Sequence, residues 1–178
     1  MILAQQVVRW ESTVDPSLCG VELRGLEVPG RERHERLHSG KPTFVLAALG
    51  SLSPAEVAAA LSKASIEFGN ARACLAVDVG VLFRLDINFL RDRNIGVVLD
   101  RVDETTPLSA ISEQAVEAVR FAANFVTRAR SDGRFACILD AMLGLSRDLG
   151  IATLGTSPHP RRRSCERFDF DYTAAQAS

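Results

Sequence analysis

The sequence predicts an α/β fold built on a mostly parallel β-sheet, either open or closed into a barrel. Short apolar runs alternate with amphipathic segments along most of the chain, as in successive βα units. Most of the later runs are apolar, which is typical of strands buried on both faces. The chain has 178 residues, of which 47% are hydrophobic, enough for one packed core. We therefore expect one domain over residues 1–178.

The first two elements are predicted to be strands. Residues 2–9 and 17–24 are short apolar or mixed runs, and the Asp and Pro between them favour a turn, so together they predict a hairpin. Residues 27–41 are charged, contain glycine and proline, and have too few apolar side chains to bury a face. We expect this stretch to be a surface connector.

The strongest local signal begins the first helix. Residues 43–49 form an apolar run that predicts a buried strand. Ser53 follows as a helix N-cap, with Pro54 at the first helical position and Glu56 at the third, which is the pattern of a capping box. The helix should end before Gly69, a residue suited to a C-terminal cap.

The alternation then continues to the end of the chain. We predict a strand at 74–81, a helix at 82–92, a strand at 95–100, a strand at 116–121, a helix through 135–149 capped by Gly150, and a strand at 151–155. The tail at 158–178 diverges from this pattern, but FDFDY within it alternates and could add a last strand.

Composition argues against several classes of function. The net charge of −1 gives no field that would attract nucleic acid or an anionic membrane, and the basic run at 161–163 beside His159 is a weak signal. His34 and His38 lie four residues apart but have no third ligand nearby. The four cysteines form no C-x-x-C pair. Residues 1–10 lack a basic segment followed by a long apolar stretch, and no apolar run approaches membrane-spanning length, so we expect neither a signal peptide nor a membrane span. We therefore expect a cytoplasmic protein without a metal or cofactor.

Two carboxylates stand at predicted strand ends, where parallel α/β folds place their active groups. Asp78 and Asp100 follow apolar runs on neighbouring strands. They could share a divalent cation, although hard cations usually take more oxygen ligands and Arg101 would oppose the charge. Alternatively, they pair with arginine or cap loop N–H groups, as buried charges usually do.

Taken in order, the strand ends resemble one family, the EAL domain, which is the bacterial cyclic-di-GMP phosphodiesterase fold. The stretches that carry the resemblance are QQVV (5–8), CGVELR (19–24), SLSPAEV (51–57), LAVDVGV (75–81), IGVVLDRVDET (95–105), VEAVRFAANFV (116–126) and DLGIATLGTSPH (148–159). The resemblance implies a shortened or degenerate TIM-type (β/α) barrel. The helical segment that the family has after its second strand is missing, and the charged connector stands in its place.

The resemblance also assigns positions to the family's active site. The metal-site positions fall on Glu22, Ser51, Asp78, Asp100, Arg101 and Thr156. The family's catalytic Lys falls on Arg120, which keeps the charge but is no tunable amine. Arg101 replaces an Asp, and a fixed cation there would repel a divalent metal ion. Since a two-metal hydrolase needs several carboxylates, the resemblance implies an inactive site.

Three functional hypotheses follow from the resemblance. The first is a catalytically inactive EAL-like regulatory protein that binds another protein, with self-association through 101–113 as one form of it. The second is a receptor that binds cyclic di-GMP through Arg24 or Arg120 without cleaving it. The third is residual phosphodiesterase activity at Glu22, Asp78 and Asp100.

Overall fold

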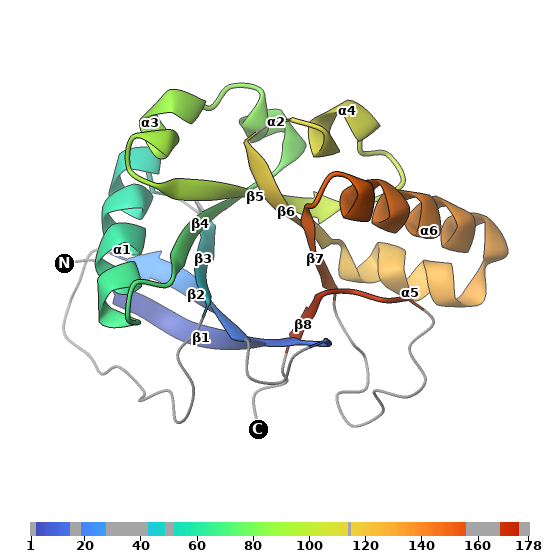
Figure 1. Cartoon of the computed structure of the whole chain (residues 1–178), viewed down its shortest axis with the longest axis horizontal. Helices are drawn as coiled ribbons and strands as arrows, with labels where there is room; N and C mark the ends of the chain where they lie inside the picture. The colour runs from blue at the N-terminus through green and yellow to red at the C-terminus, as the bar shows by residue number, and fades with distance from the viewer. Residues whose placement is uncertain are drawn as a thin grey trace.

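The fold is a closed barrel of parallel strands with one antiparallel member, seen in a computed structural model that describes residues 3–14, 19–27, 43–48, 52–113, 115–155 and 168–174 (Figure 1). The strands are β1 (Leu3–Ser12), β2 (Cys19–Glu27), β3 (Phe44–Ala48), β4 (Arg72–Val77), β5 (Ile95–Val102), β6 (Val116–Phe121), β7 (Ala152–Gly155) and β8 (Tyr172–Ala174). The helices are α1 (Pro54–Glu67), α2 (Val79–Leu82), α3 (Ile87–Arg91), α4 (Leu108–Ile111), α5 (Ala123–Ser131) and α6 (Gly133–Asp148).

Each strand hydrogen-bonds to the next in chain order, and β8 closes the ring against β1. The pairs from β2 through β8 are all parallel, whereas β1 is antiparallel to both of its neighbours. The antiparallel β1–β2 pair is the opening hairpin that the sequence predicted. The closed barrel is therefore confirmed, and the alternative of an open sheet is wrong.

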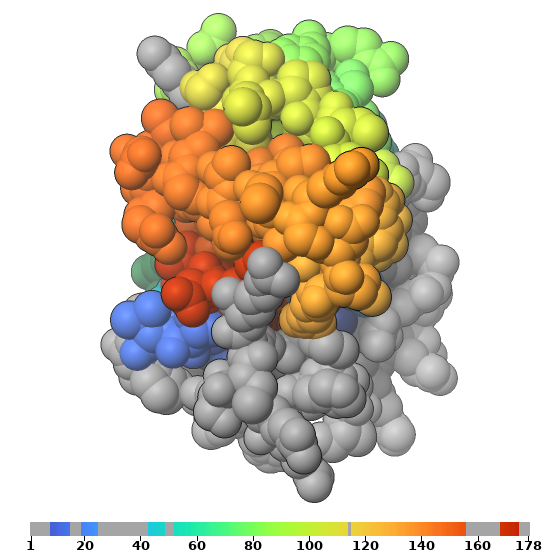
Figure 2. Space-filling model, turned by 90° about the vertical axis from the view of Figure 1, so that its right-hand side faces the viewer, coloured from blue at the N-terminus to red at the C-terminus, as the bar shows by residue number. Residues whose placement is uncertain are grey.

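The core has two layers. Inside the ring, side chains from the strands alone pack together, among them Trp10, Leu46, Cys74, Val98 and Leu154. The second and larger layer lies between the strands and the helices. The space-filling view shows α5 and α6 covering one side of the barrel (Figure 2). Strand residues in the first layer therefore point into the barrel, and those in the second layer point towards the helices.

The helix predicted from Ser53 forms as expected. Ser53 accepts a hydrogen bond from the backbone N–H of Glu56, and the Glu56 carboxylate accepts one from the Ser53 N–H at 2.9 Å. The helix ends at a C-cap at Phe68, and Gly69 follows with a φ of +76°. The capping box and the glycine therefore set both ends of α1.

Three predicted boundaries are wrong. Strand β4 ends at Val77, because the Asp78 side chain caps a new helix, α2. The single helix predicted at 82–92 is interrupted, since Asp86 caps a separate helix, α3. The predicted helix through 135–149 begins earlier, at Gly133, and the structure also has α5 directly before it.

The connector and the C-terminal tail are described only in part. Most of the connector at 27–41 and the tail residues 158–167 fall outside the described residues. The last strand is Tyr172–Ala174, at the end of the FDFDY stretch rather than along all of it. Its pairing with β7 and β1 shows that this tail completes the barrel. Among the described residues, no helix is long and apolar enough to cross a membrane.

Candidate functional site

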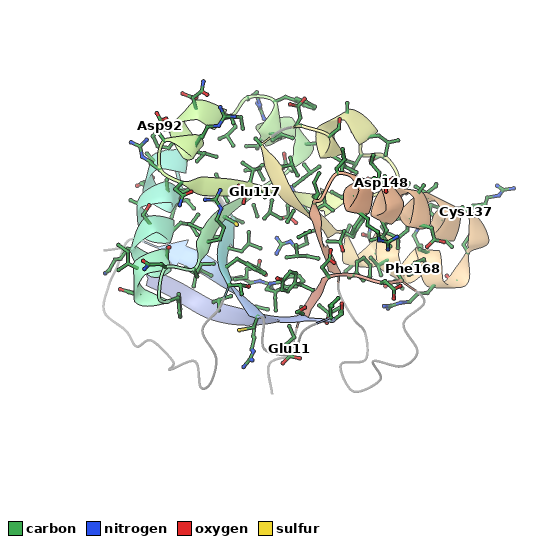
Figure 3. The ribbon with its side chains drawn as sticks, in the orientation of Figure 1. Glu11, Asp92, Glu117, Cys137, Asp148 and Phe168 are labelled. Carbon is green, nitrogen blue, oxygen red and sulfur yellow. The ribbon has the colours of Figure 1, made fainter. Side chains whose placement is uncertain are left out.

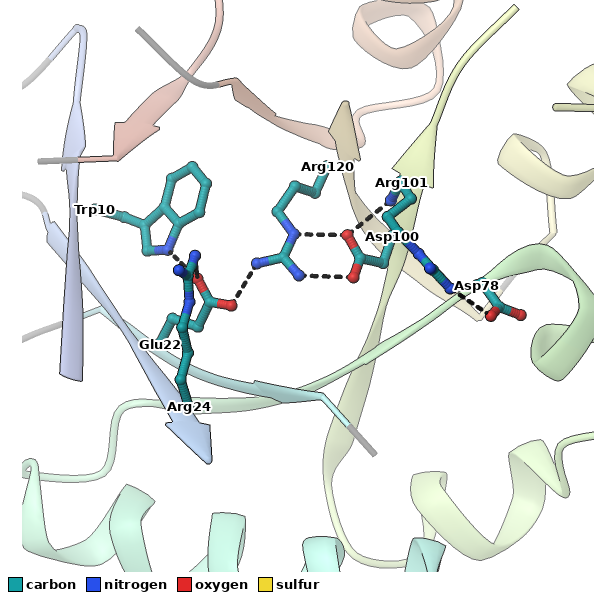
Figure 4. Close-up of polar contacts among 7 residues, drawn as sticks. All are labelled: Trp10, Glu22, Arg24, Asp78, Asp100, Arg101 and Arg120. Carbon is teal, nitrogen blue, oxygen red and sulfur yellow. Dashed lines mark hydrogen bonds and ion pairs between the residues drawn. The ribbon is translucent and has the colours of Figure 1, made fainter. Parts of the chain in front are cut away.

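Three charged side chains meet inside the barrel, towards the end where the parallel strands terminate (Figure 4). They are Glu22 of β2, Asp100 of β5 and Arg120 of β6. Glu22 pairs in register with Leu46, and Arg120 pairs with Leu154, both of which belong to the inner layer. Alternation along the strands therefore turns these charges inward, where the sequence otherwise places apolar side chains.

Arg120 lies between the two carboxylates and donates to both. Its Nε and Nη2 atoms reach Oδ1 and Oδ2 of Asp100, each at 2.6 Å, and its Nη1 reaches Oε1 of Glu22 at 2.5 Å. The side chains of Arg120, Asp100 and Glu22 are only 14%, 13% and 4% exposed. Bidentate, charge-assisted hydrogen bonds of this kind are among the strongest in proteins, and they fix the guanidinium in one orientation.

Glu22 has two further donors on its other oxygen. Trp10 Nε1 lies 3.3 Å and Arg24 Nη2 3.0 Å from Oε2. Burial alone would raise the pKa of the Glu22 carboxyl, but the hydrogen bond from Arg24 and the charge of Arg120 outweigh it and hold the pKa below its usual range. Glu22 is therefore a buried carboxylate that is ionised near neutral pH.

The charge of Arg120 is equally secured. Burial alone would lower the pKa of its guanidinium, but the hydrogen bonds and charge of Asp100, followed by those of Glu22, raise that pKa above its ordinary value. The cation is therefore permanent, and its recorded hydrogen bonds all go to the two carboxylates.

Asp78 and Arg101 form a second, more exposed pair. The pairing of β5 with β6 shifts between Leu99 and Val102, and Arg101 within this bulge has a φ of +56°, in the left-handed region. Arg101 Nη2 reaches Asp78 Oδ2 at 2.7 Å, with the two side chains 71% and 39% exposed. Asp78 Oδ1 also accepts from the Val81 N–H at 2.9 Å, so this residue both caps a helix and pairs with arginine.

The structure thus brings most of the predicted site residues together. Glu22, Arg24, Asp100 and Arg120 form one connected cluster, and Asp78 and Arg101 form the neighbouring pair. The expectation that the two aspartates pair with arginine or cap loops agrees with these contacts. Asp100 forms its ion pair with the side chain of Arg120, and from the adjacent Arg101 it accepts only the backbone N–H, at 2.7 Å. Ser51 and Thr156 lie outside the described residues.

The sequence did not indicate Trp10 as a member of the cluster. A signal was available, because Trp10 is the single tryptophan of the chain and lies in the alternating first strand. A buried indole N–H usually finds an acceptor, and the register pairs Trp10 with Gly20, two residues before Glu22 on the same strand. A carboxylate at Glu22 is therefore within reach of the indole.

These residues do not fit a divalent metal ion. Among the described residues there is no group of three or more His, Cys, Asp and Glu side chains that could hold one. The oxygens of Glu22 and Asp100 that face each other are already bonded to a guanidinium. An ion between them would have to displace a buried arginine.

Comparison with solved structures identifies the fold. The chain is similar to the EAL domain of Mycobacterium smegmatis DcpA, with 18% identity, 74% of this chain covered and a TM-score of 0.51. It is also similar to Klebsiella pneumoniae BlrP1 in complex with calcium and cyclic di-GMP, with 16% identity, 76% covered and a TM-score of 0.56. A third is the Vibrio cholerae LapD fragment of S helix, GGDEF and EAL bound to cyclic di-GMP, with 15% identity, 74% covered and a TM-score of 0.56.

The chain spans 64%, 37% and 36% of the lengths of those three structures, respectively. No protein-family model matches the chain, and no curated protein matches it. At these identities the similarity shows the fold alone. The chain therefore has the fold of the EAL domains, as the order of its strand-end motifs predicted.

Proposed function

We propose that the chain is a catalytically inactive EAL-like regulatory protein that acts by binding another protein. One observation carries this proposal. The guanidinium of Arg120 lies between Glu22 and Asp100, at the positions that the family resemblance assigns to metal-binding carboxylates. Arg120 stands at the position of the family's catalytic Lys, but its guanidinium is bonded to both carboxylates and so leaves those oxygens unavailable to a metal ion.

The magnitude of the electrostatic effect supports inactivity. A unit charge and a divalent cation 4 Å apart repel by about 8 kcal/mol at an effective dielectric constant of about 20. Moving the arginine aside would break three charge-assisted hydrogen bonds, each with a net value of about 1.5–3 kcal/mol. Either cost is comparable to the free energy of a micromolar binding event, about 8 kcal/mol. These costs oppose metal binding, and the attraction of the two carboxylates for the ion would have to exceed them.

Two exposed apolar side chains near the C-terminal ends of β4 and β5 support a surface for a protein partner. Phe83, which follows α2, and Leu108 of α4 are 58% and 54% exposed. Helices α2 and α4 lie next to one another in both views (Figures 1 and 2). Large apolar side chains so exposed favour an interaction surface, and Leu108 belongs to the 101–113 stretch through which we predicted self-association.

The test is affinity purification of the full chain from its native cell, followed by mass spectrometry. We expect a stoichiometric partner that is lost when Phe83→Asp and Leu108→Asp are combined. The matched control is Ile66→Asp on α1, an apolar side chain that is 72% exposed on a different element and should leave binding unchanged.

Light scattering of the purified chain completes this experiment, because a second copy is one of the expected partners. A monomer that captures no stoichiometric protein would contradict the proposal. Loss of the partner in the Ile66 control as well would remove the assignment to this surface.

A second candidate, a non-hydrolysing receptor for cyclic di-GMP, is favoured by the state of Arg24. Its side chain is 49% exposed and makes one recorded ion pair, to Glu22, whereas Arg120 is buried with its recorded contacts all to carboxylates. Of the two predicted ligand-binding residues, Arg24 is therefore the one that can meet a phosphate. Calorimetry with cyclic di-GMP decides between the candidates: a micromolar Kd that weakens in Arg24→Gln supports a receptor, and absence of heat removes it.

A further inference from the structure

A polar hollow opens at the N-terminal ends of β3, β4 and β5, at the opposite end of these strands from Asp78 and Asp100. It has a volume of about 370 Å³, and none of its lining residues is acidic. Ser62 comes from α1, Asn70 from the turn before β4, Arg72 from the first position of β4, and Arg93 and Asn94 from the turn into β5. These elements therefore bring two guanidinium groups and several amide and hydroxyl groups to one place.

Arg72 is held in this hollow by its neighbours. Its Nε donates to Oε2 of Glu117 at 2.9 Å, its Nη2 donates to the same carboxylate, and its Nη1 donates to the Asn94 carbonyl at 2.7 Å and to the Asn94 side chain. Glu117 of β6 is not among the residues that line the hollow, and its side chain is 42% exposed. Glu117 therefore balances the charge of Arg72, and it does so from outside the hollow.

Arg93 is fixed but not neutralised. Its Nη1 donates to the carbonyl of Phe89 at 3.1 Å, and its guanidinium lies 3.8 Å from the centre of the Phe89 ring. Within the described part of the chain, no carboxylate forms an ion pair with it, and its Nε and Nη2 have no recorded acceptor. Asp92, its neighbour in sequence, lies at the outer edge of the molecule in Figure 3. One positive charge is thus available in the hollow.

Neutral donors surround this charge. The Asn94 side-chain oxygen accepts from Arg72, which leaves its NH₂ group to donate. The Asn70 amide and the Ser62 hydroxyl have no recorded acceptor among the described residues. Asn70 and Asn94 both have a positive φ, +65° and +56°, so their backbones are committed to the turns while their side chains remain at the hollow.

The C-terminus of α1 lies near the hollow, but its partial negative charge should repel an anion only weakly. Helix C-termini carry a partial negative charge on unpaired carbonyls. Here the N–H groups of Phe68, Gly69 and Asn70 bond to carbonyls of the last turns of α1, at 2.8–3.1 Å. The carbonyls nearest the hollow are therefore already satisfied.

We propose that this hollow binds the phosphate group of a small hydroxylated metabolite, that is, a sugar phosphate or a similar phosphate monoester. A phosphate monoester carries about −1.5 to −2 charges near neutral pH and accepts several hydrogen bonds, which matches one free guanidinium and three neutral donors. The volume is at the lower end of the range for small-molecule sites, about 300–1,000 Å³, and exceeds what a phosphate needs alone. The polar lining suits hydroxyl groups in the remaining space.

The test is an NMR titration of the full chain with inorganic phosphate and with ribose 5-phosphate, at constant ionic strength set with sodium chloride. We expect saturable shifts of the Arg93 Nε–H and of the Asn70 and Asn94 side-chain amides. Arg93→Gln should weaken binding about tenfold or more, as expected for loss of a hydrogen bond from a charged group. Asn70→Gly should weaken it severalfold without strain, because glycine accepts a φ of +65°.

The matched control is Arg134→Gln at the start of α6, an exposed arginine outside the hollow, which should bind as the wild type does. Absence of saturation, or an Arg93→Gln variant that binds like the wild type, would overturn the proposal. Binding of inorganic phosphate without binding of ribose 5-phosphate would overturn the assignment of an organic ligand. Because none of these residues belongs to the Arg120 cluster or to the surface of Phe83 and Leu108, the outcome is independent of the proposed protein partner.

Discussion

Replacing Arg120 by methionine tests whether this arginine holds the interior of the barrel together. The variant keeps an unbranched side chain of similar length but leaves Asp100 with only the backbone N–H of Arg101, and Glu22 with only Trp10 and Arg24. Removing one partner of a buried ion pair typically costs about 3–5 kcal/mol. With the three side chains at most 14% exposed, we expect a loss of that size in the free energy of unfolding at pH 7.

The assay is urea unfolding followed by the fluorescence of Trp10, the single tryptophan, which lies beside Glu22. The control Arg101→Gln removes an ion pair whose arginine is 71% exposed, and should cost less than about 1 kcal/mol. Combining Arg120→Met with Asp100→Leu should recover much of the loss, because the unpaired carboxylate is gone. A loss in Arg120→Met no larger than in Arg101→Gln, or no recovery in the double variant, would refute the reasoning.

The same experiment has a pH signature. The pKa of Glu22 is depressed in the folded state, so in the wild type its contribution to stability is present above the ordinary value of 4.5 and is lost as the pH falls through the folded pKa. In Arg120→Met, one cause of that depression is removed while burial remains. The difference in unfolding free energy between the two proteins should therefore shrink as the pH is lowered from 7 towards 4. A difference that grows instead would contradict the assignment of ionised Glu22.

Three smaller predictions concern local structure. Ser53→Ala should lower the free energy of unfolding by about 1 kcal/mol through loss of the α1 cap, measured by urea unfolding, and an unchanged midpoint would contradict the capping box. Arg101→Gly should be more stable than Arg101→Ala by about 1 kcal/mol, because glycine adopts the observed φ of +56° without strain, and equal midpoints would argue against the bulge. A thiol reagent at pH 8 should label exposed Cys137 well before Cys74, whose pKa burial raises to about 12, and equal rates would show that Cys74 is accessible.

The sequence predicted those helices and strands that are marked by a local sequence pattern. The opening hairpin, the strand at 95–100 and the Ser53 cap are all present, because alternation, apolar runs and capping residues act over a few neighbouring positions. The interruption between α2 and α3 was missed, although Asp86 is an N-cap residue type. An apolar pattern in helical phase continued past it, and the pattern outweighed the cap in the prediction.

The sequence predicted which residues belong to the site, but it did not predict which carboxylate pairs with which arginine. Carboxylates and arginines at strand ends are visible in sequence, whereas their partners depend on register and on the bulge in β5. Arg101 lies next to Asp100 in sequence, but its backbone has a left-handed conformation. Its side chain pairs with Asp78, which follows β4. That conformation is uncommon for arginine, so nothing in the residue type indicated it.

Turnover of cyclic di-GMP in the presence of Mn²⁺ tests the central claim most directly. With Arg120 bonded to Glu22 and Asp100, the account predicts no linear dinucleotide above a protein-free blank. Turnover that disappears in Asp100→Ala would contradict it, since that result would require a metal ion at the carboxylates that the arginine holds.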